Sequence, residues 1–430
     1  MTPQATFMIA AVIDPERRAE LRTLLAGINS APGFADPRNT LIPYWQFRQL
    51  HVARFTILDA NTNDDIRSHG VTPTPWRPML CFIGDVDGDP ELFLAELVIR
   101  AAPGLRRIFS CCLGFDPEGD LLQWLRRHNH RPAASYVNWR GRTVTQVREE
   151  DALARALGQR VRELGDGVQP RDIHRQLRAF AAEEMAAGRL RLTPPERAPA
   201  GWYLANGSHL VAIPLALVLV APLLLAAAPL YFLCLRRRED SDVENTRPPE
   251  AAHVSALAAQ EDIDVTNHFN VFGQVKPGWL RLVTIRAGLL LLDYSSRHIY
   301  NRGYLTRVQT IHFARWVLLD GNRRVFFASN YDGSADSYMD DFINKVAWGL
   351  NLVFSNGVGY PKTRWLILGG ARREEQYKRT LRRNQLLSES WYKAYPGLTA
   401  HDLARNSRIR RGLEAERPSD REIRAWLSLL

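Results

Sequence analysis

Short apolar runs alternate with helix-forming segments near the start of the chain. Three runs of seven or eight residues are typical of buried strands. Asp followed by Pro, a strong signal for the start of a helix, occurs twice beside them. The expected elements are strands at residues 7–13, 51–58 and 79–86, a helix from Pro15 capped by Asp14, and a helix from Pro90 capped by Asp89.

The same order of elements returns in the second part of the chain. The expected elements there are strands at residues 270–275, 310–319 and 324–329, a helix after Pro277, and a helix after the cap residue Ser334. A last strand after Gly114 in the first unit, or after Gly359 in the second, would complete a ferredoxin-like β-α-β-β-α-β unit.

Residue identities support this repeated order. Residues 51–59 and 312–320 share His, Ala, Arg, Leu and Asp at the same spacing. A second block keeps a constant separation of 245 residues without a gap, as from Phe82 to Phe327. The other matched pairs are Asp87 with Asp332, Gly88 with Gly333, Phe93 with Tyr338, Gly104 with Gly349, Phe109 with Phe354, and Gly114 with Gly359. We therefore predict an α+β fold in which two tandem ferredoxin-like units pair into an α+β barrel.

These patterns divide the chain into six predicted segments. They are the first unit at residues 1–118, a hairpin with amphipathic helices at 119–205, a membrane-embedded segment at 206–238, a linker at 239–265, the second unit at 266–362 and a basic helical tail at 363–430. Within the second segment, we expect the hairpin to turn at Arg140 and Gly141 and two helices to follow at residues 149–164 and 171–187.

Residues 210–235 carry the clearest membrane signal. They hold 26 residues without a charge, and three arginines follow at 236–238. About 20 apolar residues suffice to cross a bilayer. Two related units on opposite sides of a membrane could not pack together, so we expect a helical hairpin that turns near Pro222 within one leaflet, with both domains cytoplasmic. The alternative is a single tilted span that tolerates Pro214, Pro222 and Pro229.

A second apolar segment, residues 279–300, is predicted to be a helix. It is far more apolar than residues 15–28, its counterpart in the first unit. One face of this helix is expected to touch lipid, and burial between the two domains is the alternative.

Composition narrows the class of protein. A content of 46% apolar and 24% charged residues is typical of a folded chain. The net charge of +10 is concentrated after residue 358, where 16 Lys and Arg accompany 8 Asp and Glu. Beside a membrane segment, such a tail predicts anionic lipid headgroups as partners, and nucleic acid is not expected. The four cysteines lack a metal-binding spacing, which favours a reducing compartment.

Two arginines on the repeated strand are candidate functional residues. Period-two alternation places Arg54 and Arg315 among apolar neighbours, where an unpaired guanidinium is costly. The functional interpretation is a pocket in which Arg binds an anion or a peroxide while His312 acts as ligand or base. The structural interpretation is that the arginines contact Asp59 and Asp320 or a helix C-terminus.

Residues 84–88 read Gly-Asp-Val-Asp-Gly, a literal GxxDG motif. With two ferredoxin-like units and an Arg on the sheet, this motif resembles the dye-decolourising peroxidases of the dimeric α+β-barrel superfamily. The resemblance covers about half of the chain and implies a haem, with Asp87 as the distal acid and His312 or His401 as the iron ligand. The second unit keeps Asp332 but lacks the first glycine. A turn role is the alternative for both aspartates.

The leading hypothesis is a membrane-associated, haem-dependent peroxidase-like enzyme that acts on a lipophilic or peroxide substrate. Its candidate residues are Arg54, Arg315, Asp87 and Asp332 for catalysis, His312, His401 and Trp316 for cofactor binding, and His312 as the metal ligand. The alternative is a non-catalytic, membrane-tethered module that binds lipid or a protein partner. The chain has no P-loop, dinucleotide fingerprint, HExxH or GxSxG motif, so the corresponding chemistries are not expected.

Overall fold

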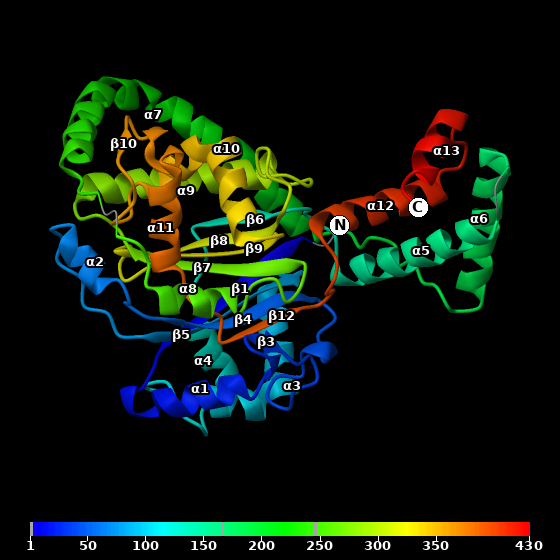
Figure 1. Ribbon diagram of the computed structural model, residues 1–430, viewed down its shortest axis with the longest axis horizontal. Coiled ribbons are helices and arrows are strands. Elements are labelled where there is room, and N and C mark those ends of the chain that lie inside the picture. Colours follow the sequence, from blue (N-terminus) through cyan, green and yellow to red (C-terminus); the bar gives the residue numbers. More distant parts are fainter. Residues whose placement is uncertain (1–2, 165–166, 245–246) are drawn as a thin grey trace.

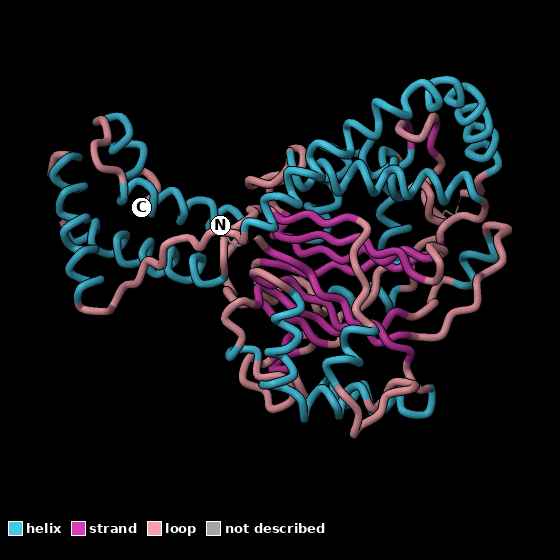
Figure 2. Tube along the Cα trace, turned by 180° about the vertical axis from the view of Figure 1, so that it is seen from behind, coloured by secondary structure: helices cyan, strands magenta, loops and turns pink. Residues whose placement is uncertain are grey.

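Two mainly antiparallel sheets lie face to face, and helices cover their outer surfaces (Figures 1 and 2). The computed structural model describes residues 3–164, 167–244 and 247–430 and has a mixed α+β fold. A long helix, α7, arches over one end of this body (Figure 1). Helices α5, α6, α12 and α13 project to one side as an arm (Figures 1 and 2).

The first sheet has six strands in the order β1-β5-β4-β12-β3-β2. Asp14 and Asp89 accept hydrogen bonds from backbone N–H groups at the predicted helix starts, so both predicted caps are confirmed. The elements of this half are β1 (Gln4–Val12), η1 (Pro15–Arg17), α1 (Arg18–Ala26), β2 (Asn29–Ala31), β3 (Phe34–Ala35), η2 (Tyr44–Gln46), β4 (Leu50–Leu58), α2 (Asn63–Ser68), β5 (Met79–Asp87), α3 (Pro90–Phe109) and α4 (Leu121–Arg127).

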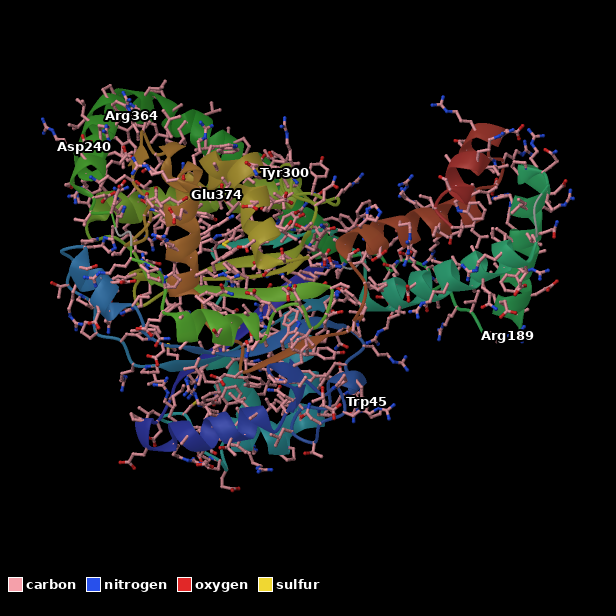
Figure 3. All side chains as sticks on the ribbon, in the orientation of Figure 1. Trp45, Arg189, Asp240, Tyr300, Arg364 and Glu374 are labelled. Carbon is pink, nitrogen blue, oxygen red and sulfur yellow. The ribbon has the colours of Figure 1, made fainter. Side chains whose placement is uncertain are left out.

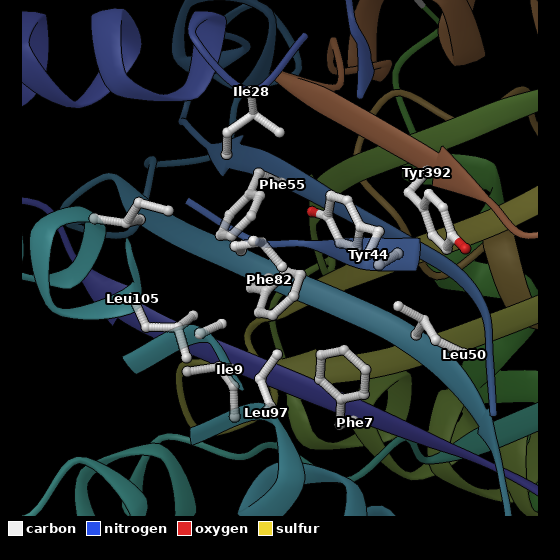
Figure 4. Packing of buried hydrophobic residues seen from close by; sticks show 14 of the residues in the cluster. Phe7, Ile9, Ile28, Tyr44, Leu50, Phe55, Phe82, Leu97, Leu105 and Tyr392 are labelled. Carbon is white, nitrogen blue, oxygen red and sulfur yellow. The ribbon is translucent and has the colours of Figure 1, made fainter. Parts of the chain in front are cut away.

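A dense aromatic and aliphatic core fills the space between this sheet and helices α1, α3 and α4. Phe55 stacks on Phe82 with ring centroids 4.3 Å apart, and Tyr44 stacks on Tyr392 at 4.5 Å (Figure 4). Tyr44 comes from the loop that precedes β4, so a loop as well as helices completes this core.

The second sheet has four strands in the order β6-β8-β9-β7. The order β1-α1-β4-β5-α3 of the first half returns here as β7-α9-β8-β9-α10, so the strands and helices expected between residues 270 and 354 are present. The last strand expected after Gly359 makes only an isolated bridge, between Gln385 and Val271. The elements are β6 (Ala134–Val137), β7 (Thr266–Gln274), α9 (Trp279–His298), β8 (Ile311–Leu319), β9 (Arg324–Asp332), α10 (Ala335–Phe354), β10 (Thr363–Arg364), β11 (Leu368–Gly369), η3 (Gly370–Arg372) and α11 (Glu374–Asn384).

Each half of the chain gives a strand to the sheet of the other half. Residues 128–130 bond to β1, and the chain then crosses over so that β6 pairs with β8. In the same way, Leu386 N donates to the Asn270 carbonyl on β7 at 2.8 Å, and β12 (Ser390–Lys393) then pairs with β4. Both crossings therefore tie the two sheets together, through β6 at one edge of the second sheet and β12 between β4 and β3 in the first.

An apolar layer also joins the sheets through their facing surfaces. Met8 and Ile83 of the first sheet belong to one buried cluster with Val317 and Phe326 of the second. Each Å² of apolar surface that is buried stabilises the folded state by roughly 25 cal/mol, so such a layer is a major source of stability. The two halves consequently form one packed body.

The predicted closed barrel does not form in the part of the chain that the structure describes. Each crossing segment makes only an isolated bridge to the sheet that it leaves. The pairing between strands therefore stops before the sheets close into a barrel. Residues 134–147 were expected to form a hairpin, but Val144 instead begins a helix and β6 pairs with β8. The segment predicted as a helical tail contributes β12 to the first sheet, because its apolar residues fill a position beside β4.

The arm consists of α5 and α6 from the middle of the chain and α12 and α13 from its end (Figure 1). Capping boxes begin α5 at Thr143, α12 at Thr399 and α13 at Ser419. A small apolar cluster of its own holds the four helices together. Their bounds are α5 (Val144–Glu163), α6 (Pro170–Ala186), α12 (Ala400–Glu414) and α13 (Asp420–Leu427).

Helix α7 (Ala200–Ser241) is continuous for 42 residues and includes Pro214, Pro222 and Pro229. The predicted hairpin with a turn at Pro222 is therefore wrong. Proline removes one backbone hydrogen bond and bends a helix, and here the three prolines accompany a curve instead of a reversal (Figure 1). Downstream, the segment expected to be a linker contains the short helix α8 (Ala251–Ala258).

Candidate functional site

Arg54 and Arg315 lie between the two sheets, and each reaches across to the half to which it does not belong. Arg54 on β4 donates to the Asn270 side chain at 2.9 Å, to two backbone carbonyls of β7 and β9, and to Asn330. Its guanidinium also lies 4.9 Å from the ring of Trp391. Neutral acceptors therefore surround a buried cation at this position.

Arg315 on β8 has a carboxylate partner. It forms a buried ion pair with Asp85 of β5, donates to Thr6, and donates to the Tyr136 carbonyl at 2.6 Å. The expected partners Asp59 and Asp320 instead pair with Arg18 and Arg323. The expectation of local partners was wrong because the facing sheet, which is distant in sequence, supplies the acceptors.

Two histidines pair with the two aspartates of the Asp-Gly turns. His51 Nε2 lies 2.9 Å from Asp87 Oδ1, and His312 Nε2 lies 2.6 Å from Asp332 Oδ1. The second oxygen of each carboxylate accepts a hydrogen bond from the first residue of an arm helix, at 2.9 Å in α5 and 2.6 Å in α12. Burial alone would raise the pKa of Asp332, but the adjacent His312 and these hydrogen bonds hold it below its usual value. Each His–Asp pair thus joins a sheet to the arm.

This histidine site does not fit a haem group. The cavity that His51 and His312 line has a volume of about 20 Å³, which is room for about one water molecule. His312 Nε2 is engaged by Asp332, and the side chain of His401 is exposed at the start of α12. Trp316 lies elsewhere, in the core of the second half. Peroxidase activity therefore stays a prediction, and we derive no step through haem.

Helix α7 is attached to α9 at both of its ends. Near its start, His209 Nδ1 lies 2.9 Å from His298 Nε2 at the end of α9. Near its end, the Tyr231 hydroxyl lies 2.8 Å from Thr284 Oγ1 close to the start of α9. Between these two contacts, the segment of α7 is about 33 Å long, whereas the segment of α9 is only about 21 Å long. The middle of α7 must therefore bow away from the body, as Figure 1 shows.

The bowed part of α7 is apolar on every side and exposed. Its most apolar window of 18 residues has no buried share, unlike a core helix of similar composition. Large apolar side chains next to α7 are exposed as well. They are Trp279, Val283, Leu290 and Leu291 on α9, Trp348 on α10, and Trp365, Ile367 and Leu368 in the β10–β11 hairpin. Exposed apolar surfaces of this kind mark sites that contact a membrane or a partner.

An apolar pocket of about 290 Å³ opens between α9 and α10. Leu291 and Trp348, both exposed in part, flank it, and Trp316 of β8 lines its sheet side. Tyr300, labelled in Figure 3, lines the pocket beyond the end of α9. Among the described residues that line it, none is charged. Sequence reasoning missed this pocket, because its walls come from segments that meet only in the folded chain.

Comparison with known proteins adds no assignment. Searches with family models, curated proteins and solved structures find no match to this chain. Within residues 3–164, 167–244 and 247–430, no group of three or more His, Cys, Asp or Glu side chains is placed to hold a metal ion. The geometry of the exposed helix and of the pocket is thus the strongest guide to function.

The first prediction concerns the buried ion pair between the sheets. Arg315→Met should lower the free energy of unfolding by about 3–5 kcal/mol, because Asp85 is left buried without its cation. Denaturant unfolding of the purified protein measures this loss. The control is Arg323→Met at an exposed pair, where a loss below about 1 kcal/mol is expected. Equal losses in the two variants would show that the inter-sheet pair is not important for stability.

The second prediction concerns His268, which is buried on β7 beside Ser388. Burial, reinforced by the charge of Arg54, lowers the pKa of His268 to about 3. The unfolded chain therefore binds a proton below pH ~6.5 that the folded protein does not bind, so stability falls as pH falls from ~6.5 towards 3. Denaturant unfolding at several pH values measures the equilibrium constant of unfolding, which should rise as the pH falls. In the wild type this rise should be steeper than in His268→Gln, by up to about tenfold per pH unit.

His401→Gln is the matched control for this measurement, because His401 is exposed. It should leave the acid slope of the wild type unchanged. A slope that His268→Gln does not reduce would contradict the assignment of His268 as a buried neutral group.

Proposed function

We propose that this protein is a monotopic membrane protein, held to one leaflet by the arched helix α7, that acts as a lipid-binding module. One observation carries the proposal. The middle of α7 is apolar and exposed, yet both ends of the helix are fixed to the same helix of the folded body. A membrane is the environment in which such an arch would be stable, because water contact with this surface is costly.

The attachment of both ends also favours one side of the membrane for the whole body. A straight crossing would separate the parts of the chain before and after α7. These parts share an apolar layer and exchange strands, so their separation would expose that layer and break the strand pairs. We therefore propose that both halves lie on the cytoplasmic side, which the arginines at 236–238 favour.

Basic residues near the end of α7 support contact with anionic headgroups. Arg237 and Arg364 are exposed beside the apolar surface, and Figure 3 shows Arg364 near the end of α7. An arginine at the interface gains about 1 kcal/mol from an anionic leaflet. Several arginines and lysines of the last segment are ion-paired with acidic side chains, so the exposed arginines near α7 are the better candidates for headgroup binding.

We further infer that the two halves arose by duplication as ferredoxin-like units. The shared order of strands and helices supports this, as does the constant separation of 245 residues. Gly88 and Gly333 both have a positive φ, of 82° and 81°, directly after the paired aspartates. The arm helices α5 and α12 both begin with a capping box after a β-strand that has crossed to the other sheet.

The third prediction tests membrane attachment. Leu219 and Leu223 in α7 are each 71% exposed, so Leu219→Glu combined with Leu223→Glu should fold normally. Each acidic residue near the bilayer core costs about 2.5–3.5 kcal/mol, and liposome binding should fall at least about a hundredfold. Flotation of the purified protein with liposomes measures this change. Wild type should also float more fully when the liposomes contain anionic lipid.

A control on the opposite face of the body is available in α3. Leu92 and Ile99 are 72% and 82% exposed, and the paired change to Glu should leave flotation intact. Tags at the two ends of the chain, in sealed vesicles treated with protease, test sidedness. Cleavage of both tags from the same side is expected, whereas tags on opposite sides would refute a monotopic arrangement.

A further inference from the structure

The apolar pocket between α9 and α10 occupies a place that is filled in the first half. Gly104 and Gly349 hold the same position in helices α3 and α10, which have equal length. In the first half, a Cβ at Gly104 would overlap the backbone of Leu41, so the loop before β4 packs directly on α3. At Gly349 the nearest atom to such a Cβ is Val346 Cγ1, at 3.8 Å. Among the described residues, no segment other than α10 itself comes within 4 Å of such a Cβ in the second half.

The chemistry of the pocket wall restricts what could occupy this space. The lining is apolar and carries no charge among the described residues, so an ionised group would lose hydration without gaining a partner. Trp316 is buried on the wall, and its Nε1–H has no hydrogen-bond partner in the described parts of the chain. An indole N–H is a donor only, and buried donors usually have an acceptor.

We propose that this pocket binds a neutral lipid, whose apolar chain packs against Gly349 and whose carbonyl oxygen accepts a hydrogen bond from Trp316 Nε1. The proposal deepens the proposed membrane association and rests on it for the source of the ligand. Leu291 of α9, the helix that α7 contacts, and Trp348 of α10 are exposed at the pocket and would lie at its entrance from the lipid phase. The volume of about 290 Å³ is near the lower end of the range for small-molecule pockets.

The direct test uses two probes of equal shape. One is the ketone undecan-2-one, and the other is the alkene 2-methylundec-1-ene, which has a methylene group in place of the ketone oxygen. Calorimetric titration of the full-length, delipidated protein in detergent measures their binding without a bilayer. The wild type should bind the ketone about fivefold more tightly than the alkene, as one neutral hydrogen bond provides. Trp316→Phe should abolish this preference while it keeps an aromatic ring in the wall. Dodecanoate should bind at least about tenfold more weakly than the ketone.

Gly349→Leu tests the site itself, because the open space at this position allows a side chain and leucine favours a helix more than glycine does. It should weaken both probes about tenfold or more by filling the pocket. Asn344→Leu is the matched control, an exposed position on the same helix that does not line the pocket, and it should bind both probes like the wild type.

Each contrary result would overturn the proposal. Equal binding of ketone and alkene by the wild type would remove the role of Trp316. Unchanged binding in Gly349→Leu would place the ligand elsewhere. These titrations contain no membrane, so they are independent of flotation. If the probes do not bind but the protein still floats with liposomes, the pocket alone is refuted. If the probes bind but the protein does not float, the membrane anchor is refuted.

Discussion

The exchange of strands between the two halves is the constraint on which the structure depends. Because β6 completes the second sheet and β12 completes the first, neither half has a full sheet without the other. The facing surfaces of the sheets then become a common interior. Any arrangement that moved the halves apart would break the backbone hydrogen bonds of β6 and β12 and expose the shared apolar layer. The position of the apolar helix relative to the body follows from this constraint.

The same constraint explains the polar residues inside the molecule. Arg54 and Arg315 hold matching positions on β4 and β8, but their partners differ, since Arg315 pairs with Asp85 and Arg54 donates to Asn330. A guanidinium in a shared interior must find its acceptors on the facing sheet, and it does so in both cases. The His–Asp pairs act in a comparable way at the junction with the arm. Repeated polar contacts of this kind hold the halves in register and do not require a common catalytic site.

The features on which the proposed function rests lie where the halves differ. In the first half, a short helix and a loop close the outer face of the sheet, and Tyr44 from that loop stacks within the core. In the second half, α9 is a helix of 20 residues that supports both the arch of α7 and one wall of the pocket. Two halves with the same order of elements thus differ, because the first is closed and the second is open towards the apolar surface. The space that could hold a ligand therefore lies in the second half.

Local patterns in the sequence determined the strands, the helix starts at Asp14, Asp89 and Ser334, and the apolar character of α7, because each depends on neighbouring residues. The last segment of the chain was harder to predict. Residues 390–393 form a strand only because a place beside β4 is open to them. Tertiary structure alone decided the strand exchange, the partners of Arg54 and Arg315, the arch of α7 and the pocket beside Trp316. These features bring together residues that are often more than 100 positions apart, and no local periodicity encodes which distant surfaces will meet.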